Sequence, residues 1–246
     1  LHELGHVMGL KHPHDDEGGR GIELPHHIDN TNFTQMSYDL PSWEPFGSIY
    51  TLTNTLMVYD IQALQYLYGA NETYNSDDTH YTFSTEKPFS LTIWDAGGED
   101  LLDFSNFDIS CEINLNDGAY STIGYRNWTA NDNFGIAFDC FIENVSGSSN
   151  DDVIIGNSLG NEISGNGGND IMYGGDGDDI FNWAADSRDG RDTMYGGQGN
   201  DIYVISDAND RVVELKGEGE ADIVYSPVNY QLPVNVEKLF GFGERG

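Results

Sequence analysis

Residues 165–182 read GNGGNDIMY GGDGDDIFN, which is one nine-residue unit written twice, and residues 196–204 repeat the unit as GGQGNDIYV. All three copies closely match the pattern GGxGxDxUx, in which U is a large apolar residue. A fixed short period of this kind is typical of repeat folds in which each unit adds one short strand to a stack. The unit therefore predicts parallel strands joined by glycine-rich turns.

The period continues on both sides of these copies. The acidic or amide position of the unit is occupied, in steps of 9, 9, 9, 13, 9, 9 and 12, by Asp152, Asn161, Asp170, Asp179, Asp192, Asp201, Asp210 and Asp222. Two positions later stand Ile154, Ile163, Met172, Phe181, Met194, Tyr203, Val212 and Val224. Because side chains alternate across a strand, each turn sends one apolar residue inward. We predict an all-β parallel β-roll over residues 147–246, with a tail at its end.

The turn chemistry of the unit suits a hard cation. Glycine lets the backbone curl so that carbonyl oxygens and the aspartate carboxylate face the same point, and calcium prefers such oxygen ligands. Without the ion the carboxylates repel and the thin core does not offset chain entropy, so binding and folding should be coupled. The calcium ligands predicted in the roll are Asp152, Asp170, Asp179, Asp192 and Asp201. The alternative, an unordered linker, is disfavoured by eight apolar positions in register.

Composition supports a cation-binding protein. The chain has 42 acidic and 10 basic residues and a formal net charge of −32, which argues against nucleic acid or an anionic membrane as partner. A disordered acidic chain would lack aromatic residues, whereas this one has 14 Tyr, 12 Phe and 4 Trp. No apolar run is long enough to span a bilayer. We expect no nucleic-acid partner, no membrane insertion and a monomer. Cys111 and Cys140 are either one disulfide or two buried thiols.

The first thirteen residues carry a second motif. They read LHELGHVMGLKHP, a complete HExxHxxGxxH string, which is the zinc-protease signature of the metzincins. His2 and His6 are four apart and share a helix face, while Gly9 lets the chain turn and return His12 as a third ligand. Glu3 then lies beside the open coordination position, where it can accept a proton from water whose pKa zinc lowers to about 7. The motif predicts a catalytic zinc site.

The rest of the chain divides by pattern. From Thr53 to Tyr68, apolar residues recur at helical spacing and Gly69 follows as a stop signal, so we predict one amphipathic helix. Residues 71–146 alternate apolar and polar side chains in short runs such as Leu91–Trp94, which indicates strands. We therefore expect a protease part at 1–70, a β-strand junction at 71–146 and the roll at 147–246.

Taken together, these stretches resemble the serralysins, secreted bacterial zinc endopeptidases with a C-terminal calcium roll of repeats-in-toxin type. The likeness rests on the zinc motif with His12-Pro13, on Met36-Ser37-Tyr38, on the helix at residues 60–69 and on the nonapeptides. It implies an α+β C-terminal subdomain of a metzincin catalytic domain followed by the all-β roll, with protein and peptide substrates and type I secretion to the extracellular space. It also implies that Met36 lies under the metal and that Tyr38 is a switchable ligand that hydrogen-bonds the developing oxyanion.

The resemblance extends to calcium sites at the junction. Residues 94–100 read WDAGGED, which is similar to the junction sequence of the family. The calcium ligands it implies are Asp95, Gly97, Gly98, Asp100, Glu143, Asn75, Asp77 and Thr79. Asp77 departs from the pattern, because the family has glycine there. As an alternative, Asp95 and Asp100 cap turns, a position that aspartate favours.

The motifs leave two function classes. Because the zinc helix opens the chain and repeat-like sequence continues to its end, we expect a fragment cut at both ends. The first class is a zinc endopeptidase in which His2, His6 and His12 bind the metal and Glu3 is the base. The alternative is a calcium-dependent secretion or adhesion module with an inert protease remnant. Zinc-dependent peptide hydrolysis would favour the first class, and calcium-driven folding without hydrolysis the second.

Overall fold

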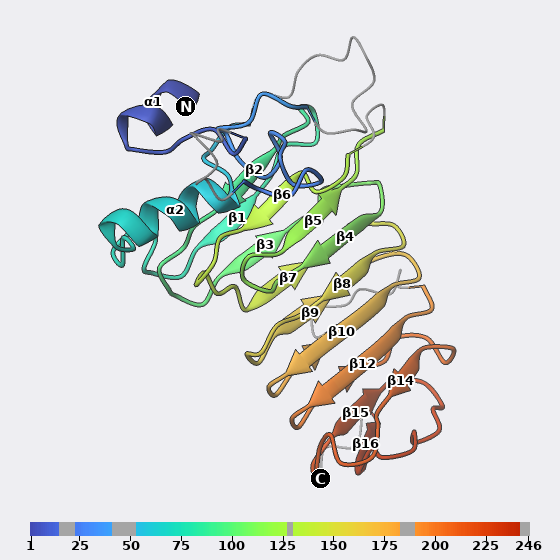
Figure 1. Ribbon diagram of the computed structural model, residues 1–246. Coiled ribbons are helices and arrows are strands. Elements are labelled where there is room, and N and C mark those ends of the chain that lie inside the picture. Colours follow the sequence, from blue (N-terminus) through green and yellow to red (C-terminus); the bar gives the residue numbers. More distant parts are fainter. Residues whose placement is uncertain (15–22, 41–52, 127–129, 183–189, 242–246) are drawn as a thin grey trace. The chain divides into compact units, whose positions relative to one another are not determined.

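The computed structural model describes residues 1–14, 23–40, 53–126, 130–182 and 190–241. Part of the polar loop that follows the zinc motif, residues 15–22, lies outside this range. The chain forms two compact units whose segments interleave: residues 1–76, 86–97 and 117–141 in the first, and residues 77–85, 98–116 and 142–246 in the second. Strands dominate, and the described residues contain two helices (Figure 1).

The first unit combines both helices with three strands. Its elements are α1 (His2–Val7), α2 (Val58–Tyr68), β2 (Leu91–Ile93), β5 (Tyr120–Ile123) and β6 (Phe134–Ile136). Strand β6 lies between the other two, parallel to β2 and antiparallel to β5. A Cβ at Gly135 would overlap the side chain of Val58 and lie in tight contact with those of Thr92 and Tyr120, so the helix start and the strands pack closely at this glycine.

Helix α2 is shorter than its sequence pattern predicted. It begins at Val58, five residues after Thr53, because the Asp60 carboxylate accepts the backbone N–H of Met57 at 2.9 Å and caps the helix there. The predicted end is confirmed: the helix stops at Tyr68, and Gly69 takes a φ of 84°. Within the described part of the chain no helix has the length and apolar character that crossing a bilayer requires.

The second unit holds the remaining strands, in two sheets. They are β1 (His80–Thr82), β3 (Leu101–Asp103), β4 (Cys111–Asn114), β7 (Asn144–Ser146), β8 (Val153–Ile155), β9 (Glu162–Ser164), β10 (Ile171–Asp176), β11 (Ile180–Phe181), β12 (Thr193–Gln198), β13 (Ile202–Val204), β14 (Arg211–Val213), β15 (Ile223–Ser226) and β16 (Lys238–Gly241). One sheet has the order β1-β3-β7-β9-β11-β13-β15-β16, and the strands β4-β8-β10-β12-β14 are consecutive in a second eight-stranded sheet that also includes β2, β5 and β6. The pairings among the strands of the second unit are parallel.

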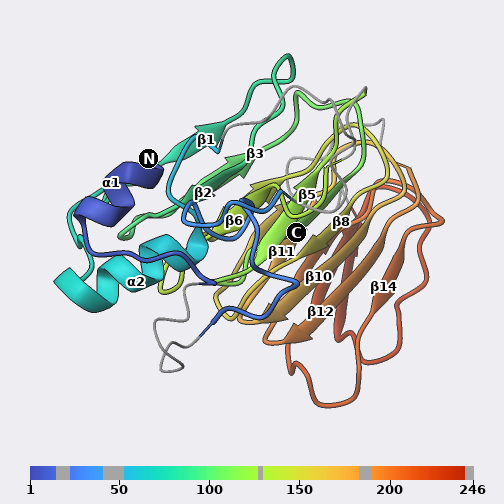
Figure 2. The same cartoon turned by 45° about the horizontal axis from the view of Figure 1, so that its top comes forward.

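The register confirms the nine-residue period. Consecutive repeats alternate between the two sheets, so Ile154, Met172, Met194 and Val212 stack in one sheet (Figure 2). Ile163, Phe181, Tyr203 and Val224 stack in the other. All eight are buried, with at most 6% of their surface exposed. The predicted parallel roll with one inward apolar residue per turn is therefore confirmed.

Both cysteines are free thiols. Cys111 lies in β4 and Cys140 in the last segment of the first unit, and each is buried. The sulfur of Cys140 accepts the backbone N–H of Asp95 at 3.2 Å. Of the two alternatives that the sequence left open, the structure has two buried thiols.

Candidate metal centres

Three imidazoles converge at the N-terminus. Helix α1 presents His2 and His6 on one face, and Gly9, with a φ of 94°, turns the chain so that His12 returns to them. Nε2 of His12 lies 3.3 Å from Nε2 of His2 and 3.0 Å from Nε2 of His6. Nitrogen ligands about 2.0–2.1 Å from a tetrahedral zinc ion are about 3.3 Å apart. The three predicted ligands therefore lie at the separation that one zinc ion requires.

The protonation of the imidazoles supports the same conclusion. Nδ1 of His2 lies 2.7 Å from the carbonyl oxygen of Gln35, and Nδ1 of His6 lies 3.0 Å from that of Leu10. A carbonyl can only accept, so in both rings Nδ1 carries the proton and Nε2 keeps its lone pair. His12 can donate a proton to one of those lone pairs at most. A cation at the centre would satisfy all three, while the carbonyls of Gln35 and Leu10 accept the Nδ1 protons of His2 and His6.

The loop that carries the Gln35 carbonyl is held by a buried carboxylate that the sequence patterns did not single out as functional. Asp60, in the first turn of α2, accepts the backbone N–H of Gln35 at 2.7 Å and the hydroxyl of Thr34 at 2.6 Å. Thr34 in turn accepts the N–H of Met36 at 3.0 Å. Burial raises the pKa of Asp60 above its ordinary value, although these hydrogen bonds favour its charged form. Asp60 thus fixes the loop that orients His2.

Met36 and Tyr38 follow on that loop. Met36 is 2% exposed and packs against Gly5 of α1, where any Cβ would overlap its sulfur. The ring of Tyr38 lies 5.0 Å from that of His2 and 4.7 Å from that of His12, centre to centre. Glu3 is exposed in the first turn of α1, next to His2. The structure thus brings Tyr38 to the histidine cluster and keeps Glu3 on the helix that carries two of its members.

The second unit carries two ladders of buried acidic and amide side chains. In each ladder the backbone N–H of one member donates to Oδ1 of an aspartate 18 to 22 residues later, which is two repeat units and one full turn of the roll. The links of one ladder are Asp152–Asp170 at 2.8 Å, Asp170–Asp192 at 3.0 Å and Asp192–Asp210 at 3.1 Å. Those of the other are Asn161–Asp179 at 2.7 Å, Asp179–Asp201 at 2.9 Å and Asp201–Asp222 at 2.9 Å. Every predicted calcium aspartate of the roll therefore lies in a ladder.

The aspartates of the ladders differ in the surroundings of their second carboxylate oxygen. In the first ladder, Oδ2 of Asp192 accepts the amide of Asn182 at 2.9 Å and Oδ2 of Asp152 accepts the N–H of Ser148 at 2.5 Å. In the second ladder, Oδ2 of Asp179, Asp201 and Asp222 is buried and has no hydrogen-bond partner within the described residues. Oxygens of this second kind are the ones that an incoming cation can take without displacing a donor.

Burial also perturbs the ladder carboxylates. It raises the pKa of Asp179 to about 8, with the charges of Asp201 and its neighbours adding to the effect. It raises the pKa of Asp152, Asp192 and Asp201 to about 6, against the backbone hydrogen bonds that each accepts. In the absence of a cation these carboxyl groups therefore ionise less readily than exposed aspartates.

The predicted junction ligands are divided between the two units. Asn75, Asp95 and Gly97 belong to the first unit, where Asp95 accepts the N–H of Gly97 at 3.0 Å, the turn-capping role considered above. The others belong to the second unit. There Oδ1 of Asp100 accepts the N–H of Thr79 at 2.8 Å, and the N–H of Asp100 donates to Glu143 at 2.9 Å. Gly98, with a φ of 135°, lies directly against the backbone of Asp77.

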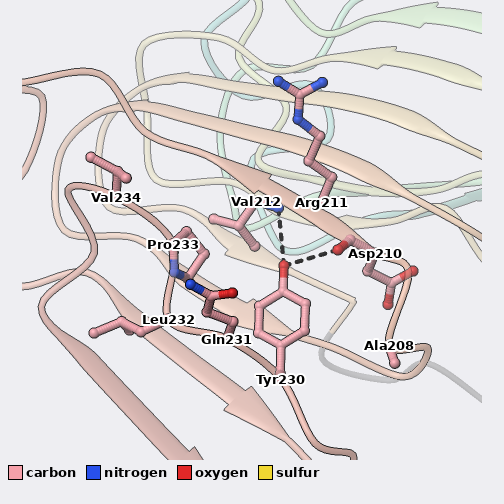
Figure 3. Close-up of a pocket in the computed structure, with 9 residues that line it drawn as sticks. All are labelled: Ala208, Asp210, Arg211, Val212, Tyr230, Gln231, Leu232, Pro233 and Val234. Carbon is pink, nitrogen blue, oxygen red and sulfur yellow. Dashed lines mark hydrogen bonds between the residues drawn. The ribbon is translucent and has the colours of Figure 1, made fainter.

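A shallow hollow of about 310 Å³ lies beside β14 (Figure 3). Tyr230 lines it, and the Tyr230 hydroxyl donates to the carbonyl oxygen of Asp210 at 2.9 Å and accepts the N–H of Val212 at 3.3 Å. The side chain of Arg211 points away from it (Figure 3). None of the residues that the sequence assigned to zinc, calcium or catalysis lines this hollow.

A three-histidine cluster and a parallel roll of aspartate-rich repeats are the features of a metalloprotease that carries a repeat module. The family model described as "Peptidase M10 serralysin C terminal" matches residues 58–242. The chain therefore belongs to this serralysin family. The zinc motif at residues 2–12 lies before the matched segment.

The curated relatives agree with the family. A serralysin from Photorhabdus laumondii is 35% identical over 182 residues, which cover 66% of this chain and 37% of the relative. Metalloprotease AprA from Pseudomonas entomophila is 36% identical over 183 residues, covering 66% and 37%. Serralysin A from Dickeya chrysanthemi is 36% identical over 168 residues, covering 63% and 34%. The matched part of the chain thus spans little more than a third of each of these relatives.

Proposed function

We propose that this chain is part of a zinc-dependent endopeptidase that hydrolyses peptide bonds of proteins. The observation that carries the proposal is the convergence of three Nε2 atoms at 3.0 and 3.3 Å, with both Nδ1 atoms of the helix histidines turned to carbonyls. His2, His6 and His12 would hold the metal, as part of an α+β metzincin subdomain. A zinc ion held by these residues would supply Lewis-acid chemistry, polarising the peptide carbonyl and lowering the pKa of water.

Two side chains complete the proposed site. Glu3 accepts a proton from the attacking water and passes it to the leaving amine, since its helix places it beside His2. Tyr38, whose ring lies against His2 and His12, donates its hydroxyl proton in a hydrogen bond to the oxyanion. Met36 supports the cluster from below by filling the space beside Gly5.

The second unit has the proposed role of a calcium-stabilised module. Buried carboxylate oxygens of Asp179, Asp201 and Asp222 without a donor support calcium binding in the ladder that contains them. Asp152, Asp170 and Asp192 are proposed as calcium ligands in the other ladder, and the junction residues named above are proposed as further calcium ligands. By the family resemblance we also propose secretion to the extracellular space through a type I pathway. We also propose that the chain divides into a protease part at residues 1–70, a β-strand junction at 71–146 and the roll at 147–246.

The zinc assignment is tested by separating metal binding from catalysis. We expect Glu3→Gln to keep one zinc per chain and to lose most peptide hydrolysis, because the ligands survive while proton transfer fails. Tyr38→Phe should cost less, about 10²–10³ in turnover, because it removes one oxyanion donor and leaves the metal in place. Zinc content is measured by metal analysis of this chain, and casein hydrolysis in the full-length protein of which this chain is proposed to be a part.

Glu72→Gln is the matched control, because Glu72 is an exposed carboxylate of the same unit, outside the histidine cluster. It should leave both zinc content and hydrolysis unchanged. Near-normal hydrolysis by the Glu3→Gln protein, or a failure of His2, His6 and His12 to bind zinc, would overturn the proposed catalytic site.

A further inference from the structure

The repeat changes its chemistry in the last turns of the second unit. In the sheet β8-β10-β12-β14, the pairs Met194–Val212 and Tyr195–Val213 place Glu214 level with Gly196 in the next turn. The same register stacks Gly196 on Gly174 and Gly174 on Gly156. A column of glycines thus ends in a glutamate.

The side chain of Glu214 lies inside the roll. It is 5% exposed, and a Cβ added to Gly196 would overlap Glu214 Oε1, Asp201 Oδ2 and the hydroxyl of Tyr203. The space that Gly196 leaves open is therefore bordered by three oxygen atoms of three different side chains. Tyr203 is fully buried and donates its hydroxyl proton to Oε1 of Glu214.

A third carboxylate joins this group. Asp201, Glu214 and Asp222 each offer one oxygen, and these oxygens lie within 4.8 Å of one another. Calcium binds oxygen at about 2.3–2.6 Å, so two ligands of one ion can be separated by up to about 5.2 Å. Asp201 and Asp222 are 0% exposed. Oδ2 of both, and Oε2 of Glu214, are buried with no hydrogen-bond partner among the residues described.

The preceding turn lacks these features. Phe181 stacks on Tyr203 with ring centres 5.1 Å apart, so the equivalent side chain one turn earlier has no hydroxyl. Gly196 has no side chain where Glu214 has a carboxylate. Three buried carboxylates repel one another and are costly without a compensating charge. Compared with the preceding turn, this turn therefore adds a buried carboxylate, Glu214, and a hydroxyl donor, Tyr203, that orients it.

We propose that Asp201, Glu214 and Asp222 bind one calcium ion in the core of the roll, through three carboxylates instead of the glycine carbonyls of earlier turns. This inference rests on the proposal that the roll binds calcium. Because calcium affinity rises with the charge of the ligand set, this site is the tightest of the roll. Tyr203 is a positioning residue, since it fixes Oε1 of Glu214 and leaves Oε2 to the ion.

The test compares calcium binding by the full chain and by three variants, using equilibrium dialysis for stoichiometry and calorimetry for affinity. Glu214→Gln has nearly the same shape and removes the charge, so we expect it to lose the tightest calcium and to bind one ion fewer at low free calcium. Tyr203→Phe should keep the number of ions and bind the tightest one more weakly. The matched control is Glu162→Gln, an exposed carboxylate on β9, which should match the unmodified chain.

The outcomes separate this site from the roll as a whole. Circular dichroism in saturating calcium shows whether each variant still forms its strands. If the Glu214→Gln chain does not fold, the calcium affinity of the Tyr203→Phe chain is the test instead. The same number and affinity of ions in folded Glu214→Gln as in the unmodified chain overturns the site, because a protonated Glu214 or an ordinary repeat site would give that result. If the unmodified chain binds no calcium, the proposed function of the roll itself has failed.

Discussion

At the scale of single residues, the zinc ligands depend on groups far along the chain. His2 is oriented by the carbonyl of Gln35, and the loop of Gln35 is held by Asp60. The Asp60 carboxylate also accepts the N–H of Met57 at the start of α2. One buried side chain therefore couples the geometry of the histidine cluster to the position of a helix.

This coupling gives a prediction for Asp60. Asp60→Asn should lower zinc affinity by about 10–100-fold, the usual effect of losing an outer-shell partner, because the amide cannot accept from both Gln35 and Thr34 as the carboxylate does. Competition with a zinc chelator measures the affinity. Asp39→Asn, an exposed change on the same loop, is the control. Unchanged zinc affinity in a folded Asp60→Asn chain would show that the carboxylate does not act on the cluster.

Site residues could be predicted from the sequence where they lie close together along the chain, and could not where they meet only through the fold. The grouping of His2, His6 and His12 followed from spacing within eleven residues, and the structure brings the three together. Asp60 acts across 25 residues of chain, and the group of Asp201, Glu214 and Asp222 forms only when strands are in register. No local pattern encodes such contacts. The one available signal was the replacement of a repeat glycine by Glu214.

At the scale of elements, the roll was predictable because its period is regular. Each inward apolar residue stands two positions after a ladder residue, so the sequence alone defined both the core and the strands. The start of α2 was less predictable, because a carboxylate cap and not the apolar spacing decides where it begins. The interleaving of the two units also has no local signature, since segments 77–85 and 98–116 join a core that is built mostly after residue 142.

The ladders give a prediction about pH. Burial raises the pKa of Asp179 to about 8 and that of Asp152, Asp192 and Asp201 to about 6, all above the unfolded value of 3.8. A raised folded pKa contributes stability that is complete below the unfolded pKa and is lost as pH rises through the folded pKa. The calcium-free chain should therefore be more stable at pH 5 than at pH 8.5.

Circular dichroism between pH 5 and pH 8.5 in the presence of a calcium chelator, with urea unfolding wherever the chain is folded, measures this trend. With calcium bound the trend should reverse, because the ion requires ionised carboxylates and its affinity rises with pH. A calcium-free chain that becomes more stable between pH 5 and pH 8.5 would contradict the raised pKa values of the ladder.

At the scale of the whole molecule, charge decides whether the fold persists. The formal net charge of −32 is spread over 246 residues, but the second unit concentrates buried aspartates one turn apart. Neighbouring strands lie about 4.8 Å apart, whereas the Debye length in 0.1 M salt is about 10 Å. Simple salt therefore cannot screen one ladder aspartate from the next. At a pH where the ladder carboxylates are ionised, an ion bound between turns can compensate these charges.

We accordingly expect calcium to fold the roll. Titration of calcium into the metal-free chain at pH 8 should convert residues 147–225 from disordered to β-rich, because the ion compensates carboxylates that the unfolded chain exposes to water. Circular dichroism follows the conversion. Sodium chloride at matched ionic strength should not reproduce it, and neither should magnesium, whose smaller octahedral shell suits these oxygens poorly. If the metal-free chain is already β-rich and calcium leaves its spectrum unchanged, the apolar core alone holds the roll and the ladders are not its source of stability.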